Sequence, residues 1–132
     1  MADDRQTSSP TPWVIAALAA SAWGVVAVTF ASLAPPSLVP HIFYSYHVEH
    51  FAAFYVLAFV AAAGLPRQSL TALSLAMICF AIVLELIRML TPTHRLSSAE
   101  DLICDIAGVF GAYAPILIGR FRDSLLRLRS DS

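Results

Sequence analysis

The stretch 69-SLTALSLAMICFAIVLELIRML-90 is predominantly apolar, but Glu85 and Arg88 interrupt it near its end. It has the length of about 20 residues that a helix needs to cross a hydrocarbon core about 30 Å thick. A charge inside such a helix costs about 2.5 to 3.5 kcal/mol on insertion scales, so charged residues there require an explanation. Glu85 and Arg88 are three residues apart, which places them on one face of the helix, where they can pair. The stretch therefore predicts a membrane-spanning helix with an ion pair near one end.

Composition extends this prediction to the whole chain. Of its 132 residues, 58% are hydrophobic and only 13% are charged, which is far more apolar than the core of a soluble domain of this size requires. We predict an all-α, polytopic membrane protein whose four helices form one compact bundle. The predicted transmembrane spans are about 13–34, 47–65, 69–90 and 98–119.

The second span determines which residues its helix must contain. The apolar run Phe51–Leu65 is too short to cross a bilayer unless the helix begins near His47, so the helix carries both His47 and His50. Gly64 and Pro66 favour an end to that helix, because glycine suits a helix C-terminus and proline cannot continue one. The predicted parts of the chain are a disordered tail at 1–12, a single transmembrane domain at 13–119 and a basic tail at 120–132 that extends the last helix.

The arginines predict the orientation of the helices. The chain has no lysine, and its eight arginines divide six to two between the two sides of the predicted bundle. Because cytoplasmic loops carry an excess of positive charge, the side with six arginines, which includes both termini, is predicted to be cytoplasmic. Arg88 and Arg95 then lie toward the extracytoplasmic side.

Polar side chains gather on this extracytoplasmic side, at the ends of three predicted helices. His47 and His50 open the second helix, Asp101 and Asp105 open the fourth, and each pair shares one helix face. Small residues that follow the aspartates on their face permit close helix contact. Glu49 points elsewhere and is expected to face water. The candidate ligand-binding residues are His47, His50, Glu85, Arg88, Arg95, Asp101 and Asp105.

The order of these residues carries a family resemblance. His50-Phe51 opens one helix, Glu85 lies near the end of the next, and Arg95, Asp101, Asp105 and Gly108 lead through the last. This order resembles the VanZ-like family of small bacterial membrane proteins, whose pattern is Asp-Lys-x-x-His-Phe, Glu-x-x-Gln and Arg-x5-Asp-x3-Asn-x2-Gly. The resemblance covers about residues 47–111. It implies a multi-pass protein of the bacterial inner (cytoplasmic) membrane with a role in the cell envelope, because the family's namesake is associated with resistance to the glycopeptide teicoplanin.

The chain departs from that family pattern at four positions. Tyr46 and His47 replace the Asp-Lys pair, Arg88 replaces the glutamine, and Asp105 replaces the asparagine. We interpret Asp105 as an added carboxylate that balances the added charge of Arg88.

Three functions account for a polar cluster of this kind. We favour binding of a lipid-linked or anionic envelope ligand, with Arg88 and Arg95 holding a phosphate or carboxylate and an apolar groove between the second and third helices holding an acyl or isoprenoid chain. The first alternative is a membrane-embedded hydrolase or transferase acting on a lipid phosphate. His50 would then be the general base and Glu85 or Asp101 its orienting partner, although no nucleophile motif is present. The second alternative is a structural protein whose charges only hold the helices together.

Other classes of function have weaker support. A metal ion would face two nearby arginines, so we expect no metal site, and no cofactor or nucleic-acid motif is present. Ion or proton conduction requires polar residues throughout the membrane, but here they stop at one side. The expected partners are membrane lipids and a lipid-linked cell-envelope precursor, and the sequence leaves the oligomeric state open.

Overall fold

The computed structural model describes residues 11–40, 42–91 and 99–130. These residues form α1 (Pro12–Leu33), the short 3-10 helix η1 (Pro36–Leu38), α2 (Tyr46–Gly64), α3 (Leu70–Leu90) and α4 (Ala99–Ser130). Each of the four α-helices in this part of the chain is long and apolar enough to cross a membrane. The described chain is thus an all-helical, multi-pass membrane protein, as predicted.

Local sequence explains where the helices begin and end. Ser69 caps α3, because its side-chain oxygen accepts a hydrogen bond from the backbone N–H of Ala72 at 3.1 Å. The second helix ends at Gly64, with Leu65 as its C-cap, where glycine and the following proline predict an end. The fourth helix continues to Ser130, so residues 120–130 of the predicted basic tail are a continuous extension of the last span.

Little of the predicted N-terminal tail belongs to the described structure. Residues 1–10 lie outside the described residues, and Pro12 is already the first residue of α1. A proline suits this position because the N–H groups in the first turn of a helix have no acceptor within the helix, so the missing N–H of proline removes no hydrogen bond.

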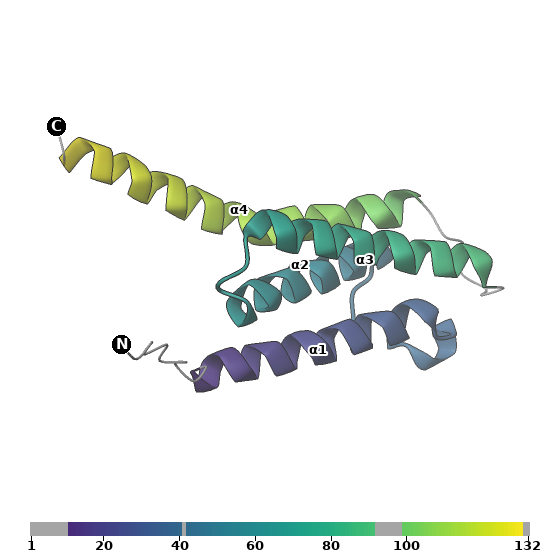
Figure 1. The fold of residues 1–132 in the computed structure, drawn as a ribbon. Coiled ribbons are helices and arrows are strands. Elements are labelled where there is room, and N and C mark those ends of the chain that lie inside the picture. The colour runs from purple at the N-terminus through teal and green to yellow at the C-terminus, as the bar shows by residue number, and fades with distance from the viewer. Residues whose placement is uncertain (1–10, 41, 92–98, 131–132) are drawn as a thin grey trace.

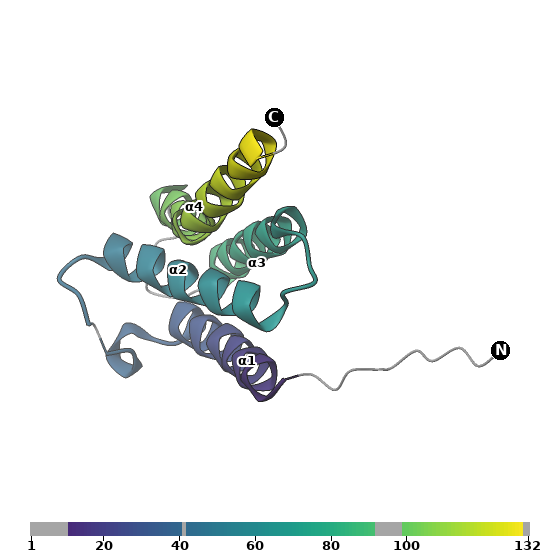
Figure 2. The same ribbon diagram turned by 90° about the vertical axis from the view of Figure 1, so that its left-hand side faces the viewer.

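The second helix occupies the centre of the bundle and contacts the other three long helices (Figures 1 and 2). Its most extensive contact is with α4, and the core there includes Phe54, Ala58, Val109 and Tyr113. By contrast, α1 has no buried residue, and large side chains such as Trp23 are exposed along it. Such a surface is suited to contact with lipid chains.

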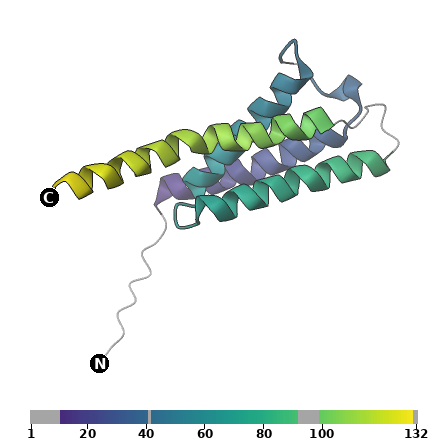
Figure 3. The same ribbon diagram turned by 90° about the horizontal axis from the view of Figure 1, so that it is seen from above.

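One end of the bundle collects the helix termini that carry the charged residues. The N-terminal ends of α2 and α4 and the C-terminal end of α3 lie toward the right in Figure 1. We refer to this as the polar end of the bundle. At the opposite end, α4 continues past Pro115 and projects beyond the other helices (Figures 1 and 3).

Candidate functional site

Four ionisable side chains are buried at the polar end. Glu85 and Arg88 on α3 expose 7% and 2% of their surface, and Asp101 and Asp105 on α4 expose 2% and 3%. Removing a charge from water costs several kcal/mol unless a partner compensates it. The contacts of these four side chains therefore determine what the cluster can do.

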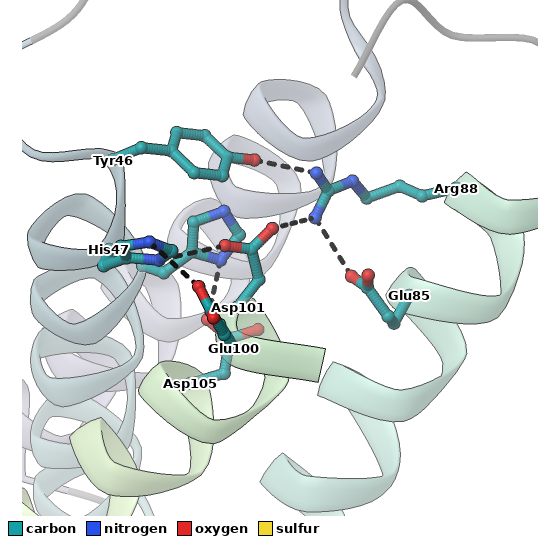
Figure 4. Close-up of polar contacts among 8 residues, drawn as sticks. Tyr46, His47, Glu85, Arg88, Glu100, Asp101 and Asp105 are labelled. Atoms are coloured by element: carbon teal, nitrogen blue, oxygen red, sulfur yellow. Dashed lines mark hydrogen bonds and ion pairs between the residues drawn. The ribbon is translucent and has the colours of Figure 1, made fainter. Parts of the chain in front are cut away.

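Arg88 is the centre of the cluster (Figure 4). Its Nη1 group donates to Oε2 of Glu85 at 3.0 Å and to Oδ2 of Asp101 at 3.5 Å, and its Nη2 group donates to the hydroxyl of Tyr46 at 2.9 Å. One guanidinium group thereby joins α2, α3 and α4, and the predicted pair of Glu85 and Arg88 is confirmed. A phosphate held by both terminal nitrogens of Arg88 would have to displace these contacts.

A second connection joins α2 directly to α4. The Nδ1 atom of His50 lies 2.8 Å from Oδ1 of Asp105. The ring of Tyr46, one helical turn earlier, packs edge-on against His50 with the ring centroids 4.5 Å apart. Asp105 therefore engages His50, whereas the predicted partner of Asp105 was Arg88. Direct pairing of Asp105 with Arg88 is not observed, because the aspartate that contacts Arg88 is Asp101.

His47 forms the outer edge of the cluster. Its Nδ1 atom lies 3.3 Å from Oδ1 of Asp101, and its Nε2 atom lies 3.5 Å from Oε2 of Glu100 (Figure 4). The side chain of His47 is 47% exposed, whereas that of His50 is 11% exposed. The exposure of the side chains in the cluster thus increases from the buried Arg88 to His47 at the surface.

Negative charge exceeds permanent positive charge in this cluster. Among the described residues, the three buried carboxylates are matched by one buried guanidinium group. The two histidines can supply further positive charge by binding protons. Two buried atoms, Oε1 of Glu85 and Nε of Arg88, have no hydrogen-bond partner within the described part of the chain. Because buried polar atoms nearly always have partners, these two atoms mark a place for water or a polar ligand group.

The structure brings most of the predicted site residues together and adds Tyr46 and Glu100 to them. Tyr46 contributes to the cluster through its hydroxyl group, and its spacing of four residues from His50 is the signal that places both on one helix face. Glu49 does not simply face water as expected, because its Oε1 accepts the backbone N–H groups of Ile42 and Phe43 at 2.8 and 3.1 Å. The predicted residues brought together are His47, His50, Glu85, Arg88, Asp101 and Asp105. Arg95 lies outside the described residues.

An apolar groove of about 430 Å³ adjoins the polar end. It runs between α1 and α2, whereas the sequence predicted a groove at this end between the second and third helices. Small residues such as Gly24, Ala27 and Ala53 line it and leave room between the two helices. Tyr46, Glu49 and His50 also line it. The groove therefore connects an apolar space with side chains of the charged cluster.

Fold and site together define the class of protein. It is a multi-pass helical membrane protein with a charged cluster buried at one end of the bundle and an apolar groove beside it. Comparisons of the chain with known protein families, curated proteins and solved structures give no match. Within the described residues, no group of three or more His, Cys, Asp and Glu side chains is placed to hold a metal ion.

Proposed function

We propose that this protein is a VanZ-like cell-envelope protein that binds a lipid-linked ligand in the groove between α1 and α2. The observation that supports this most directly is the groove itself, because it is apolar along α1 and α2 and is also lined by Tyr46, Glu49 and His50. A ligand with an acyl or isoprenoid chain and a polar head group fits this groove, because its chain matches the apolar part and its head group matches the polar part.

His50 is the side chain best placed to meet the head group. Its Nδ1 atom is engaged by Asp105, which fixes the ring and leaves Nε2 as the nitrogen that can contact a ligand. Both terminal nitrogens of Arg88 already bind protein groups. For an anionic ligand, Arg95 is therefore the arginine that we propose as the partner.

The proposed setting follows from the arginine distribution and from the family resemblance. With both termini cytoplasmic, the polar end faces the extracytoplasmic side of a bacterial inner membrane. There it would meet lipid-linked precursors of the cell envelope, and a link to glycopeptide (teicoplanin) susceptibility is part of this proposal. Reporter fusions after Arg67 and after Leu90 test the orientation, and an extracytoplasmic Arg67 would overturn it.

Filling the groove should remove the ligand while leaving the charged cluster intact. Ala27 lines the groove from α1, and the ring introduced by Ala27→Phe would take up space that a bound chain needs. At about 0.8 kcal/mol per buried methylene, displacement of only two methylene groups lowers the affinity about tenfold, so the loss should be at least about tenfold. Native mass spectrometry of the purified protein with bacterial envelope lipids measures this loss.

Ala22→Phe provides the matched control. Ala22 is exposed on the same helix and is not part of the groove lining, so the added ring should face the membrane without displacing a ligand. Equal lipid occupancy of the Ala22 and Ala27 variants would overturn binding in this groove.

A second candidate function, hydrolysis or transfer at a lipid phosphate, is favoured by the contact between His50 and Asp105. A carboxylate on Nδ1 holds an imidazole so that Nε2 can act as a general base. In hydrolysis, Nε2 would take the proton of a water molecule as that water attacks phosphorus. The proton would then pass to the oxygen that leaves as the phosphorus–oxygen bond breaks. The orienting partner in this arrangement is Asp105, in place of the predicted Glu85 or Asp101.

Asp105→Asn separates catalysis from binding. The amide keeps an oxygen toward His50 but removes the charge that stabilises a protonated imidazole, so turnover should fall on the order of 10²- to 10⁴-fold. Lipid occupancy should change much less. Time-resolved mass spectrometry of the lipids measures both quantities. If the unaltered protein retains lipid without forming any new lipid product, the enzymatic candidate is excluded and binding remains.

A further inference from the structure

A second pocket lies at the opposite end of the bundle from the charged cluster. It has a volume of about 280 Å³ and is formed by residues of α2, α3, α4 and the turn between α2 and α3. Apolar side chains such as Phe59, Leu73 and Ile116 form its walls. Among the described residues that line it, the two polar side chains are Gln68 and Arg120.

Arg120 gives this pocket a positive charge. It lies on α4 and is exposed, and within the described residues its guanidinium group forms no ion pair. An arginine next to an apolar space combines a phosphate-binding group with room for a hydrocarbon chain. The complementary molecule is therefore a lipid with an anionic phosphate.

The extension of α4 keeps this surface close to lipid head groups. At 1.5 Å per residue, the 32 residues of α4 span about 48 Å, which exceeds the hydrocarbon thickness of about 30 Å. The projecting part carries exposed Phe121, Leu125 and Leu128, whose spacings of four and three residues place them on one stripe. Arg122 and Arg129 lie beside that stripe. An apolar stripe flanked by arginines suits an interface with anionic lipids.

We propose that this second pocket binds an anionic phospholipid. One acyl chain lies against the apolar walls, and the phosphate oxygens accept hydrogen bonds from the guanidinium group of Arg120 and the side-chain amide of Gln68. The site is separate from the groove between α1 and α2, so this proposal does not depend on what occupies that groove.

Affinity for two lipids with identical chains tests this site. Native mass spectrometry titrations of the full-length protein with phosphatidylglycerol and with phosphatidylcholine should show tighter binding of the anionic lipid. Arg120→Gln should weaken phosphatidylglycerol binding about fivefold, which is the effect of one arginine near an anionic surface. Binding of phosphatidylcholine, which has the same phosphate but carries a compensating choline charge, should weaken less. Ala63→Phe, which fills the pocket without changing charge, should weaken binding of both lipids.

Arg122→Gln is the matched control for charge. Arg122 lies about 200° further round the helix than Arg120 and does not line the pocket, so its loss should change phosphatidylglycerol affinity less than twofold. Equal losses in the two arginine variants would show a diffuse attraction to the basic helix and would overturn the pocket. Equal affinity of the unaltered protein for both lipids would also overturn the pocket. Thermal unfolding without lipid shows whether each variant remains folded. A folded Ala63→Phe variant that keeps full affinity would overturn the pocket as well.

Discussion

Replacing Arg88 with methionine should lower the free energy of unfolding by about 3 to 5 kcal/mol. The substitution leaves the carboxylate of Glu85 buried without its cation, removes the guanidinium donor from the buried carboxylate of Asp101, and removes the donor that binds the hydroxyl of Tyr46. Because these partners lie on three different helices, the loss should appear as unfolding of the whole bundle. Reversible unfolding in mixed micelles, followed by circular dichroism, measures the difference.

Arg67→Met is the control for removal of an arginine as such. Arg67 is exposed in the turn between α2 and α3, so its loss should change stability by at most about 0.5 kcal/mol. Adding Glu85→Leu and Asp101→Leu to Arg88→Met should restore most of the lost stability, because uncharged side chains have no desolvation cost to offset. If Arg88→Met is as stable as Arg67→Met, the guanidinium group does not hold the three helix ends together.

The double variants identify the partner of Arg88 on α4. Arg88→Gln combined with Asp101→Asn should be less destabilised than the sum of the single changes, with a coupling of about 0.5 to 3 kcal/mol for residues in contact. Arg88→Gln with Asp105→Asn should be close to additive, because the carboxylate of Asp105 contacts His50. Strong coupling with Asp105 would contradict the observed contacts.

The apolar runs and helix periodicity were sufficient to predict much of this fold. The four spans depend on length and composition, and the structure confirms them as helices. The pairing of Glu85 with Arg88 depends only on positions within one helix, so a spacing of three residues predicts it. The sequence also indicated that Asp101 and Asp105 share a buried face, because charges in an apolar segment turn toward other polar groups.

Contacts between helices could not be read from the sequence with the same certainty. Asp101 and Asp105 are one turn apart, about 6 Å along the axis, so the partner of Arg88 depends on how far α3 is shifted against α4. No periodicity specifies that shift. The position of the groove depends in the same way on how α1 is placed against α2. Small residues such as Gly24 and Ala27 leave space for a groove, but they do not determine that placement.

Because Gly108 has no side chain, α2 and α4 can approach closely at this position. Gly108→Val should therefore lower the free energy of unfolding by about 1 to 3 kcal/mol. A Cβ atom at Gly108 would collide with the backbone carbonyl oxygen of Phe51 and would lie 3.0 Å from the backbone nitrogen of Tyr55. Backbone atoms of a helix cannot move aside as a side chain can, so the two helices must separate. The contact between His50 and Asp105 joins the same helices and should weaken with them, which the NMR signals of the His50 ring would report.

The other two glycines of α4 form a graded control for this effect. At Gly111 the nearest atom to a new Cβ is Cζ of Phe51 at 3.3 Å, a side-chain atom that can move, so valine there should cost less. At Gly119 nothing lies within 4 Å, and valine there should stabilise the helix by a few tenths of a kcal/mol, because its helix propensity exceeds that of glycine. The variant at Gly119 should therefore be the most stable of the three, the variant at Gly111 less stable, and the variant at Gly108 the least stable. Equal effects at all three positions would mean that helix propensity, and not the approach of α2 to α4, sets the cost. In that case the close contact of these helices would not be what positions His50 against Asp105.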